Sequence, residues 1–228
     1  RSSDLEVLLK NLSKKISIIL KTLITPIFNI AYRSASRVVS LGKSMSTQLR
    51  SKGISKSKIV IIRNWGLGDF KTIKAPNKLS KEWNISSEFN LIYSGNLGIA
   101  HEWETLLKAL RLSKLRSDQL KILFISSGTR INQAKTFAKT FLPLNSVIFK
   151  PLVKVENLPL TMGLADMAIV TLRSTYDGLV SPSKLSGYLA RGLPILFIGS
   201  DPELKEIIET NDAGAVFSPG DYESLTKY

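Results

Sequence analysis

The sequence predicts an α/β fold in which a parallel β-sheet is covered by helices on both faces. From Phe89 onward, short apolar runs alternate with helical segments, the pattern of parallel strands joined by helices. The chain has 228 residues, enough to bury a substantial core. Its content of 43% hydrophobic and 22% charged residues is typical of a globular protein. We therefore expect a Rossmann-like domain in the second part of the chain.

The predicted strands of this domain are five short runs of apolar residues. They are Phe89–Tyr93, Leu120–Ile125, Val147–Phe149, Met167–Val170 and Ile195–Ile198. Helical segments are expected at about 102–114, 130–141, 156–164, 183–191 and 202–210, by periodicity and length. Ligands of such sheets bind beyond the carboxyl ends of the strands, so function is expected in the loops that follow the strands.

The residues before this domain predict part of another domain and a linker. Two extended runs, Arg37–Ser40 and Lys58–Ile62, flank a predicted helix at Lys43–Lys52. The β-branched run Ile59–Ile62 is typical of a buried strand. Gly, Pro, Asn and Ser interrupt any periodicity in 65–86. The predicted organisation is a partial domain at 1–64, an interdomain linker at 65–86 and a Rossmann-like domain at 87–228.

A basic amphipathic helix is predicted at 4–31. Its apolar residues follow a 3.6-residue period, and Lys10, Lys14 and Lys21 lie on the opposite side. Pro26 is a position where this helix could kink. Two interpretations remain open: a surface helix packed on another domain, or attachment to an anionic membrane surface. No signal peptide and no membrane-spanning segment is predicted, and the start at Arg1 indicates a piece of a larger protein.

The charge balance favours anionic partners. Lys and Arg number 32 against 18 Asp and Glu, a net charge of +14. Basic and aromatic residues are spread along the chain without a stacking stripe, so no nucleic-acid partner is predicted. There is no cysteine and one histidine. This composition excludes disulfides and zinc–cysteine sites and argues against a histidine-rich metal site.

The first candidate loop is Ser94-Gly95-Asn96-Leu97-Gly98, between a strand and a helix. Glycine allows the backbone to approach a ligand closely, and the free N–H groups of a following helix can face an anion. The Gly-x-x-Gly spacing is not the dinucleotide fingerprint. A purely structural tight turn is the alternative interpretation.

The second candidate loop, Ser181-Pro182-Ser183-Lys184, gives the stronger signal. Ser181 is a favourable N-cap, and proline suits the first helical position. Ser183 and Lys184 would then present N–H groups, a hydroxyl and an ammonium to a pyrophosphate. A capped helix with a solvated lysine is the alternative. Two such helix N-termini on one sheet could grip a diphosphate from both sides.

Other residues that follow predicted strands are weaker candidates. His101 comes soon after Gly98 and is placed to contact a phosphate or its sugar, although a structural role is equally compatible with the sequence. Residues expected to line a base or ribose pocket are Ser127, Gly128, Lys150, Pro151 and Leu152. Ordinary strand-to-helix loops would also explain these residues.

With these motifs in view, the chain resembles the family 4 glycosyltransferases of the GT-B fold. It looks closest to those that build bacterial capsule, O-antigen or exopolysaccharide chains. The resemblance rests on the motifs Tyr93–Gly98 with His101, Val180–Leu185, and Tyr188–Pro194, and upstream on Tyr32–Val39 and Ile62–Trp65. The Pro-Ser-Lys-Leu segment with the downstream Gly-x-Pro is the most specific part and indicates a Pro-Ser-Lys-Leu subgroup.

The resemblance implies the C-terminal, nucleotide-sugar-binding half of a GT-B enzyme, preceded by the end of the N-terminal acceptor domain. It implies a retaining transfer from a UDP- or GDP-sugar to a glycan or lipid-linked acceptor, without bound metal. By position, Gly95, Asn96 and Gly98 would lie against the phosphates or the sugar. Ser183 and Lys184 would hold the diphosphate, and Lys150–Leu152 would flank the base. A cytoplasmic enzyme, peripheral on the inner face of the cell membrane, is the implied location.

The chain departs from the family pattern at one point. Many members carry two glutamates eight positions apart, and the matching positions here are Leu179 and Gly187. The resemblance therefore implies a different way of contacting the sugar and ribose. A complete active site is expected to need the missing acceptor domain, in cis or in trans. Alternatives are a nucleotide-sugar 2-epimerase-like isomerase and a non-catalytic subunit that binds a nucleotide-sugar or recruits a partner to the membrane.

Overall fold

The computed structural model describes residues 26–66 and 72–228. The chain divides into two compact units. The first consists of Arg1–Asn64, Thr175–Ser181 and Asp201–Glu203, and the second of Trp65–Ser174, Pro182–Ser200 and Leu204–Tyr228. Most of the basic helix predicted at 4–31, including Lys10, Lys14 and Lys21, lies outside the described residues.

The first unit contains a small two-stranded sheet. A helix at 26–34 precedes β1 (Val38–Ser40), α3 (Lys43–Ser51) and β2 (Ile59–Ile61). The two strands are parallel, with Val38 opposite Ile59. The helix runs three residues beyond the predicted end at 31. The run Ile59–Ile62 forms the predicted strand at Ile59–Ile61. Its expected burial was wrong, because β2 pairs only with β1 and Ile61 and Ile62 are 41% and 46% exposed.

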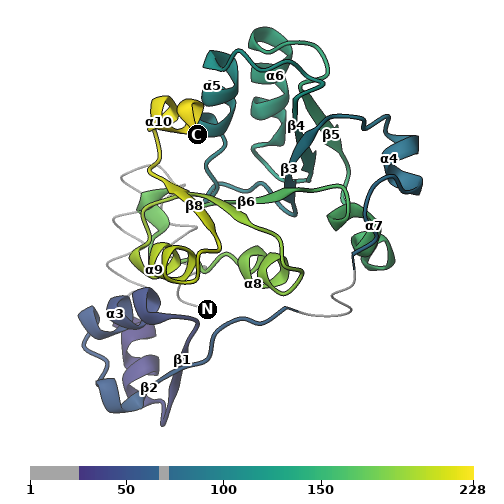
Figure 1. Cartoon of the computed structure of the whole chain (residues 1–228). Helices are drawn as coiled ribbons and strands as arrows, with labels where there is room; N and C mark the ends of the chain where they lie inside the picture. Colours follow the sequence, from purple (N-terminus) through teal and green to yellow (C-terminus); the bar gives the residue numbers. More distant parts are fainter. Residues whose placement is uncertain (1–25, 67–71) are drawn as a thin grey trace. The chain divides into compact units, whose positions relative to one another are not determined.

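The second unit is built on a six-stranded parallel sheet, which confirms the predicted fold class (Figure 1). Its strands are β3 (Phe89–Ser94), β4 (Leu120–Ile125), β5 (Val147–Lys150), β6 (Met167–Thr171), β7 (Ile195–Ile198) and β8 (Gly214–Phe217). Their order across the sheet is β5-β4-β3-β6-β7-β8. The chain therefore runs outward from β3 in one direction and, after crossing back to β6, outward in the other.

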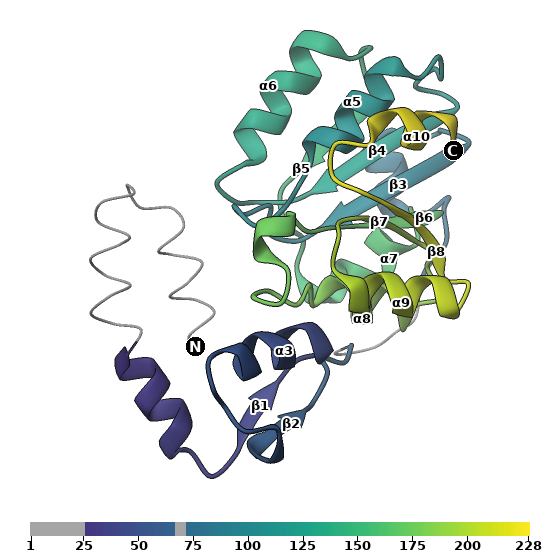
Figure 2. The same ribbon diagram turned by 90° about the vertical axis from the view of Figure 1, so that its left-hand side faces the viewer.

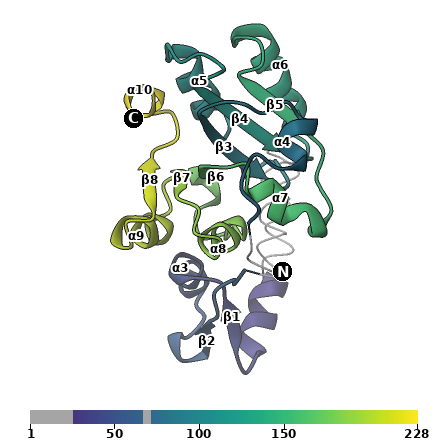
Figure 3. The same ribbon diagram turned by 45° about the vertical axis from the view of Figure 1, so that its right-hand side comes forward.

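Helices cover both faces of this sheet. They are α4 (Lys78–Glu82), α5 (Glu104–Leu112), α6 (Ile131–Phe141), α7 (Leu158–Met162), α8 (Lys184–Leu189), α9 (Pro202–Thr210) and α10 (Tyr222–Lys227). Figure 2 shows α5, α6 and α10 on one side of the sheet and α7, α8 and α9 on the other, and Figure 3 agrees. The central strands are almost completely buried, with Ile92, Leu123 and Ile169 at 0% exposure. This burial explains why those strands are continuously apolar in sequence.

The segment 65–86, predicted to be irregular, contains the short helix α4. Asn77 begins it with a reciprocal capping box: its side chain accepts hydrogen bonds from the backbone N–H of Leu79 and Ser80, at 2.9 and 3.1 Å. The Ser80 hydroxyl oxygen accepts one in return from the Asn77 N–H, at 2.8 Å. Asn and Ser were interpreted as breakers of periodicity, but here they satisfy the free N–H groups of a first helical turn.

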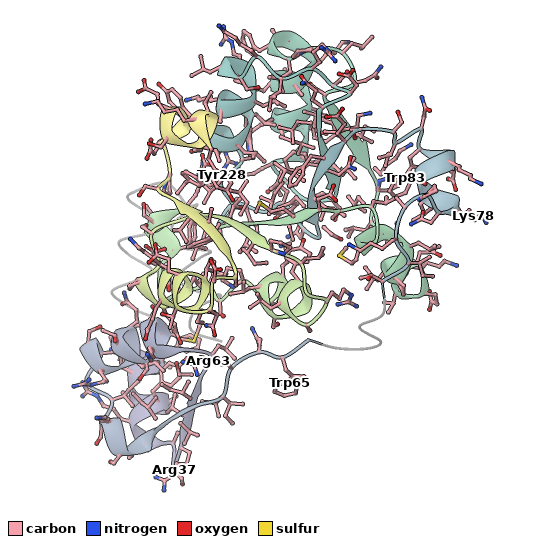
Figure 4. The ribbon with its side chains drawn as sticks, in the orientation of Figure 1. Arg37, Arg63, Trp65, Lys78, Trp83 and Tyr228 are labelled. Atoms are coloured by element: carbon pink, nitrogen blue, oxygen red, sulfur yellow. The ribbon has the colours of Figure 1, made fainter. Side chains whose placement is uncertain are left out.

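We predict that Asn77→Ala lowers the free energy of unfolding by about 2 kcal/mol, the sum of a lost cap and two partly buried carbonyls that lose a donor. Besides capping α4, the Asn77 amide donates to the carbonyls of Ile73 and Leu160, at 2.8 and 3.0 Å. Urea-induced unfolding measures the change. The neighbouring Lys78 is exposed and lies on α4 (Figure 4), so Lys78→Ala is the control. Equal stabilities of the two variants would contradict this role of Asn77.

Candidate functional site

The strand order places a crevice between β3 and β6. The connection from β3 leads to β4 on one side, and the connection from β6 leads to β7 on the other. Loops that leave two neighbouring parallel strands in opposite directions open a ligand-binding crevice at the carboxyl ends of those strands. The predicted loop Ser94–Gly98 follows β3, and the predicted loop Ser181–Lys184 lies between β6 and β7. The topology therefore makes this edge of the sheet the expected place for a ligand.

The loop after β3 depends on glycine for its shape. Gly95 has φ +126°, a region that residues with a β carbon rarely adopt. A β carbon on Gly95 would also lie 2.6 Å from Cε of Lys184. The side chain of Leu97 is fully buried and its N–H donates to the Ser127 carbonyl at 2.7 Å, whereas Asn96 is exposed. The loop is thus anchored at Leu97 and presents Asn96 outward.

The loop after β4 supports the loop after β3 from the side. Gly128 has φ +119°, and a β carbon there would lie 2.7 Å from the Leu97 carbonyl oxygen. Ser126 donates its hydroxyl to the Gly95 carbonyl at 2.7 Å. Backbone contact this close leaves room only for glycine at position 128. Gly128 thus fixes the position of the neighbouring loop, a role that the sequence interpretation did not assign to it.

Lys184, the first residue of α8, reaches across to the loop after β3. Its Nζ donates to the Asn96 carbonyl oxygen at 3.3 Å and lies 4.9 Å from the centre of the Tyr93 ring. Burial lowers the pKa of Lys184 from 10.5 to about 8, because a charged group loses hydration there. The structure thus brings Lys184 together with two other predicted residues, Gly95 and Asn96. Lys184 and Asn96 are 88 positions apart in the sequence. An anion beside Lys184 would offset the cost of burying the ammonium.

His101 lies close to the same group. Its Nδ1 is 2.9 Å from the Thr171 carbonyl oxygen at the end of β6, and its ring packs edge-on against Tyr93 at 5.8 Å between centroids. Burial lowers the pKa of His101 to about 4, and the nearby Lys184 charge acts in the same direction. His101 is therefore neutral at physiological pH.

Two buried tyrosines contact these residues and were not predicted as site residues. Tyr93 donates its hydroxyl to the Asn96 carbonyl at 2.8 Å. Tyr188, on α8, accepts a hydrogen bond from the Ser94 N–H at 2.8 Å and donates to the Ser94 carbonyl at 3.2 Å. Burial raises the pKa of both phenols, so each keeps its donor proton. Their hydrogen bonds connect α8 with the loop after β3. Both tyrosines stand in apolar stretches of the sequence, so they were interpreted as strand and helix residues and not as part of a site.

An ion-pair cluster contacts the backbone of His101. It was not predicted from the sequence. Glu104 binds both Arg130 and Arg173, the latter at 2.9 Å. Arg130 also donates to the His101 carbonyl oxygen at 2.8 Å. Burial opposes ionisation of Glu104, but hydrogen bonds from Arg130 and from the backbone of Glu104 and Trp103, together with the Arg130 charge, outweigh it and lower the pKa of Glu104. The next carboxyl along, Glu102, has its pKa raised to about 7 by burial. No sequence spacing could reveal this cluster, because Glu104 begins α5, Arg130 precedes α6 and Arg173 follows β6.

The predicted start of the helix at Ser181–Pro182 was wrong. The helix α8 begins at Lys184 with Ser183 as N-cap, and no side chain caps it. The Leu185 N–H donates to the Pro182 carbonyl at 3.2 Å, a tight i to i+3 turn that replaces the first helical turn. With only six residues, α8 has a small dipole, so the ammonium of Lys184 rather than the helix end supplies the positive charge. Ser181 belongs to the first unit and the other predicted donor-site residues to the second.

The residues predicted for a base or ribose pocket line the carboxyl ends of β4 and β5. Ser127 is exposed beside Gly128. Lys150 ends β5, its carbonyl accepts the Ser126 N–H at 2.9 Å, and its Nζ lies 5.4 Å from the Trp83 ring centre. Pro151 and Leu152 follow and are exposed. These residues continue the same edge of the sheet, on β4 and β5, which are two and three strands away from β6.

A cavity of the second unit lies elsewhere. It measures about 460 Å³ and lies near the amino ends of β3 and β4, beneath α5 and α10. Tyr228, labelled in Figure 4, is one of its lining residues. Its walls are mainly apolar side chains such as Leu106, Leu110 and Leu225. Because it lies at the opposite ends of the strands from the crevice and carries no cationic side chain, it is not the candidate site for an anion.

A protein-family model covers the part of the chain that contains this site. Residues 77–228 match the model described as "Glycosyl transferases group 1". The chain belongs to this family, also known as glycosyltransferase family 4. The match covers the six-stranded sheet and every loop of the candidate site.

Two curated relatives are bacterial glycosyltransferases by name. One is "Probable glycosyltransferase WbjE" of Pseudomonas aeruginosa, 28% identical over 90% of this chain and 51% of that protein. The other is "Putative colanic acid biosynthesis glycosyl transferase WcaI" of Escherichia coli K12, 24% identical over 84% of this chain and 48% of that protein. The chain spans about half the length of these relatives.

A solved structure supports the fold. The Anabaena protein Alr3699/HepE, crystallised in complex with UDP and glucose, matches 91% of this chain and 56% of its own, with a TM-score of 0.75 and 17% identity. The second unit therefore has the fold of the C-terminal domain of GT-B glycosyltransferases.

The described residues contain neither a candidate membrane span nor a candidate metal cluster. Between 26 and 66 and from 72 to 228, no helix is long and apolar enough to cross a bilayer. In the same ranges, no group of three or more His, Asp or Glu side chains has the arrangement of a metal site.

Proposed function

We propose that this chain forms the donor-binding part of a retaining glycosyltransferase of the Pro-Ser-Lys-Leu subgroup. The enzyme would transfer a sugar from a UDP- or GDP-sugar to a glycan or lipid-linked acceptor in surface polysaccharide synthesis. The observation that carries this proposal is Lys184, partly buried against the Asn96 carbonyl at the β3–β6 crevice in a member of the group 1 family.

The chemistry follows from the charge that develops during transfer. As the bond between the sugar and the diphosphate breaks, negative charge accumulates on the leaving phosphate oxygen. A cation and backbone N–H groups fixed in advance stabilise that charge without reorganising. Lys184 supplies the cation, and the loop around Gly95, Asn96 and Gly98 supplies close backbone approach. Ser183 adds a hydroxyl beside the lysine, so that no metal is needed for the leaving group.

The remaining parts of the proposal assign roles to the rest of the chain. Residues 87–228 bind the donor, 65–86 connect the domains, and 1–64 belong to the acceptor domain, whose other residues act in cis or in trans. Ser127, Gly128, and Lys150–Leu152 flank the base and ribose. The enzyme works in the cytoplasm, with the basic helix predicted at 4–31 available for the inner face of the membrane.

Calorimetric titration of the 228-residue chain with UDP, GDP, UDP-glucose and GDP-mannose tests the proposal. The titration is done in the presence of a chelator. We expect one nucleotide family to bind with one site per chain, because the lysine and the loop provide the anion site without metal. Far-UV circular dichroism of the same sample confirms folding. A folded sample that binds none of the four compounds would refute the donor-site assignment.

A further inference from the structure

His101 has one ring nitrogen engaged by the protein and one without a protein partner. Nδ1 lies 2.9 Å from the Thr171 carbonyl oxygen. A carbonyl oxygen only accepts hydrogen bonds, so Nδ1 must carry the proton that is donated. Within the described residues, Nε2 has no hydrogen-bond partner. In the neutral ring, this nitrogen is a lone-pair acceptor.

The surroundings favour this neutral form. The Lys184 ammonium repels a second positive charge, and burial lowers the pKa of the ring to about 4. The carboxylate of Glu104 is engaged by Arg130 and Arg173, and Glu102 accepts from the Thr105 N–H at 3.1 Å. Neither carboxylate therefore holds the ring as an imidazolium.

A neutral Nε2 acceptor cannot bind a phosphate oxygen, which also only accepts. It fits a hydroxyl. Lys184 and His101 both lie against Tyr93, the ammonium 4.9 Å from the ring centre and the imidazole at 5.8 Å. A diphosphate on the ammonium would therefore place the attached sugar within the range of the imidazole. Lys184, a cation and donor, therefore suits the diphosphate, and His101, a neutral acceptor, suits a hydroxyl of the sugar.

We propose that His101 is a specificity-determining residue whose Nε2 accepts a hydrogen bond from a hydroxyl of the donor sugar, rather than a phosphate-binding residue. The inference rests on the proposed function, because it places a nucleotide-sugar on Lys184. It narrows the expectation that His101 contacts a phosphate or its sugar to the sugar alone. It also assigns recognition of the sugar to a residue other than the paired glutamates, whose positions hold Leu179 and Gly187 here.

The first test reads the tautomer directly. The chain contains one histidine, so a long-range ¹H–¹⁵N correlation spectrum of the ¹⁵N-labelled protein contains one set of imidazole signals. At pH 7 we expect the neutral ring with the proton on Nδ1, and a shift of the Nε2 signal when a nucleotide-sugar is added. A proton on Nε2, or an imidazolium at pH 7, would overturn the proposal.

The second test separates sugar from phosphate. UDP-glucose, UDP-galactose, UDP-N-acetylglucosamine and GDP-mannose are each compared with their nucleoside diphosphate, and the pair with the largest gain from the sugar is kept. His101→Asn retains an amide near Nδ1 for Thr171 but has no group near Nε2. It is expected to reduce nucleotide-sugar affinity roughly 3- to 10-fold, the range for one hydrogen bond, and to leave the affinity for the diphosphate unchanged. His101→Gln, which places an amide near Nε2, should recover part of the loss.

The outcomes separate the two proposals. If no sugar adds affinity, or if His101→Asn weakens the diphosphate and the nucleotide-sugar by the same factor, the role of His101 is wrong while donor binding stands. If the unsubstituted chain binds no nucleotide at all, the proposed function fails, and the role of His101 fails with it.

Discussion

Gly128→Ala is expected to destabilise the second unit by about 2–6 kcal/mol and to reduce nucleotide affinity by roughly tenfold or more. Two effects add. The backbone at φ +119° is strained for any residue with a β carbon, at about 1–3 kcal/mol. The new methyl group would also lie 2.7 Å from the Leu97 carbonyl oxygen, and overpacking of this kind costs about 1–3 kcal/mol. The displaced loop carries Asn96 and the contact with Lys184.

Gly192→Ala is the matched control. Gly192 also has a positive φ, +68°, but a β carbon there would have no heavy atom within 4 Å. It should therefore show only a conformational cost, about 1 kcal/mol, and unchanged nucleotide binding. Urea unfolding and calorimetric titration of both variants give the comparison. If Gly128→Ala loses no more stability and no more nucleotide affinity than Gly192→Ala, the close approach of the two loops contributes to neither, and this prediction is wrong.

Lys184→Met is expected to change binding and stability in opposite directions. Loss of a charged hydrogen-bond donor to the diphosphate should lower affinity by about 10- to 100-fold. The same change removes a buried ammonium while the methionine keeps the apolar stem. The Asn96 carbonyl keeps its other partner, the Tyr93 hydroxyl at 2.8 Å. We expect a gain of about 1–3 kcal/mol at pH 7, seen as a melting temperature raised by a few degrees.

The pH dependence has a definite sign. The pKa of Lys184 is about 8 in the folded chain and 10.5 as a free side chain. Below pH 8 both states are protonated, and the fold bears the full cost of the buried charge. Between pH 8 and 10.5 the unfolded state binds more protons, so the stability contributed by this group rises with pH. The stabilisation by Lys184→Met should thus shrink across this window. A variant less stable than the parent at pH 7 would contradict the burial cost.

Much of the fold was predictable because burial leaves a direct trace in the sequence. The strands Leu120–Ile125 and Ile195–Ile198 were predicted at their observed bounds, since strands covered on both faces are uninterrupted apolar runs. The edge strand β8, Gly214–Phe217, was missed. It begins with glycine and alanine, and its residues are only partly buried, so its apolar signal is weak.

The candidate site was predictable only in its parts. Glycine, proline and a lysine after strands indicate loops and an anion, and these signals depend on local sequence. The contact of Lys184 with the Asn96 carbonyl depends on β3 and β6 being neighbours, which no local pattern states. The protonated nitrogen of His101 is likewise set by the Thr171 carbonyl, 70 positions away. For the short helix α4 the local signal was present but was misinterpreted. Its capping residues, Asn77 and Ser80, were interpreted as breaks in the periodicity.

Proton uptake on nucleotide binding tests most directly whether Lys184 holds the diphosphate. At pH 8, close to its pKa of about 8, roughly half of the lysine is neutral, and an anion beside it would draw in the missing proton. Calorimetric titration with the preferred diphosphate, in two buffers of different ionisation enthalpy, gives the number of protons. Glu102, whose pKa is about 7, contributes equally in the parent and in Lys184→Met. We predict that the parent takes up about half a proton more than Lys184→Met; equal uptake by the two chains would contradict the proposed site.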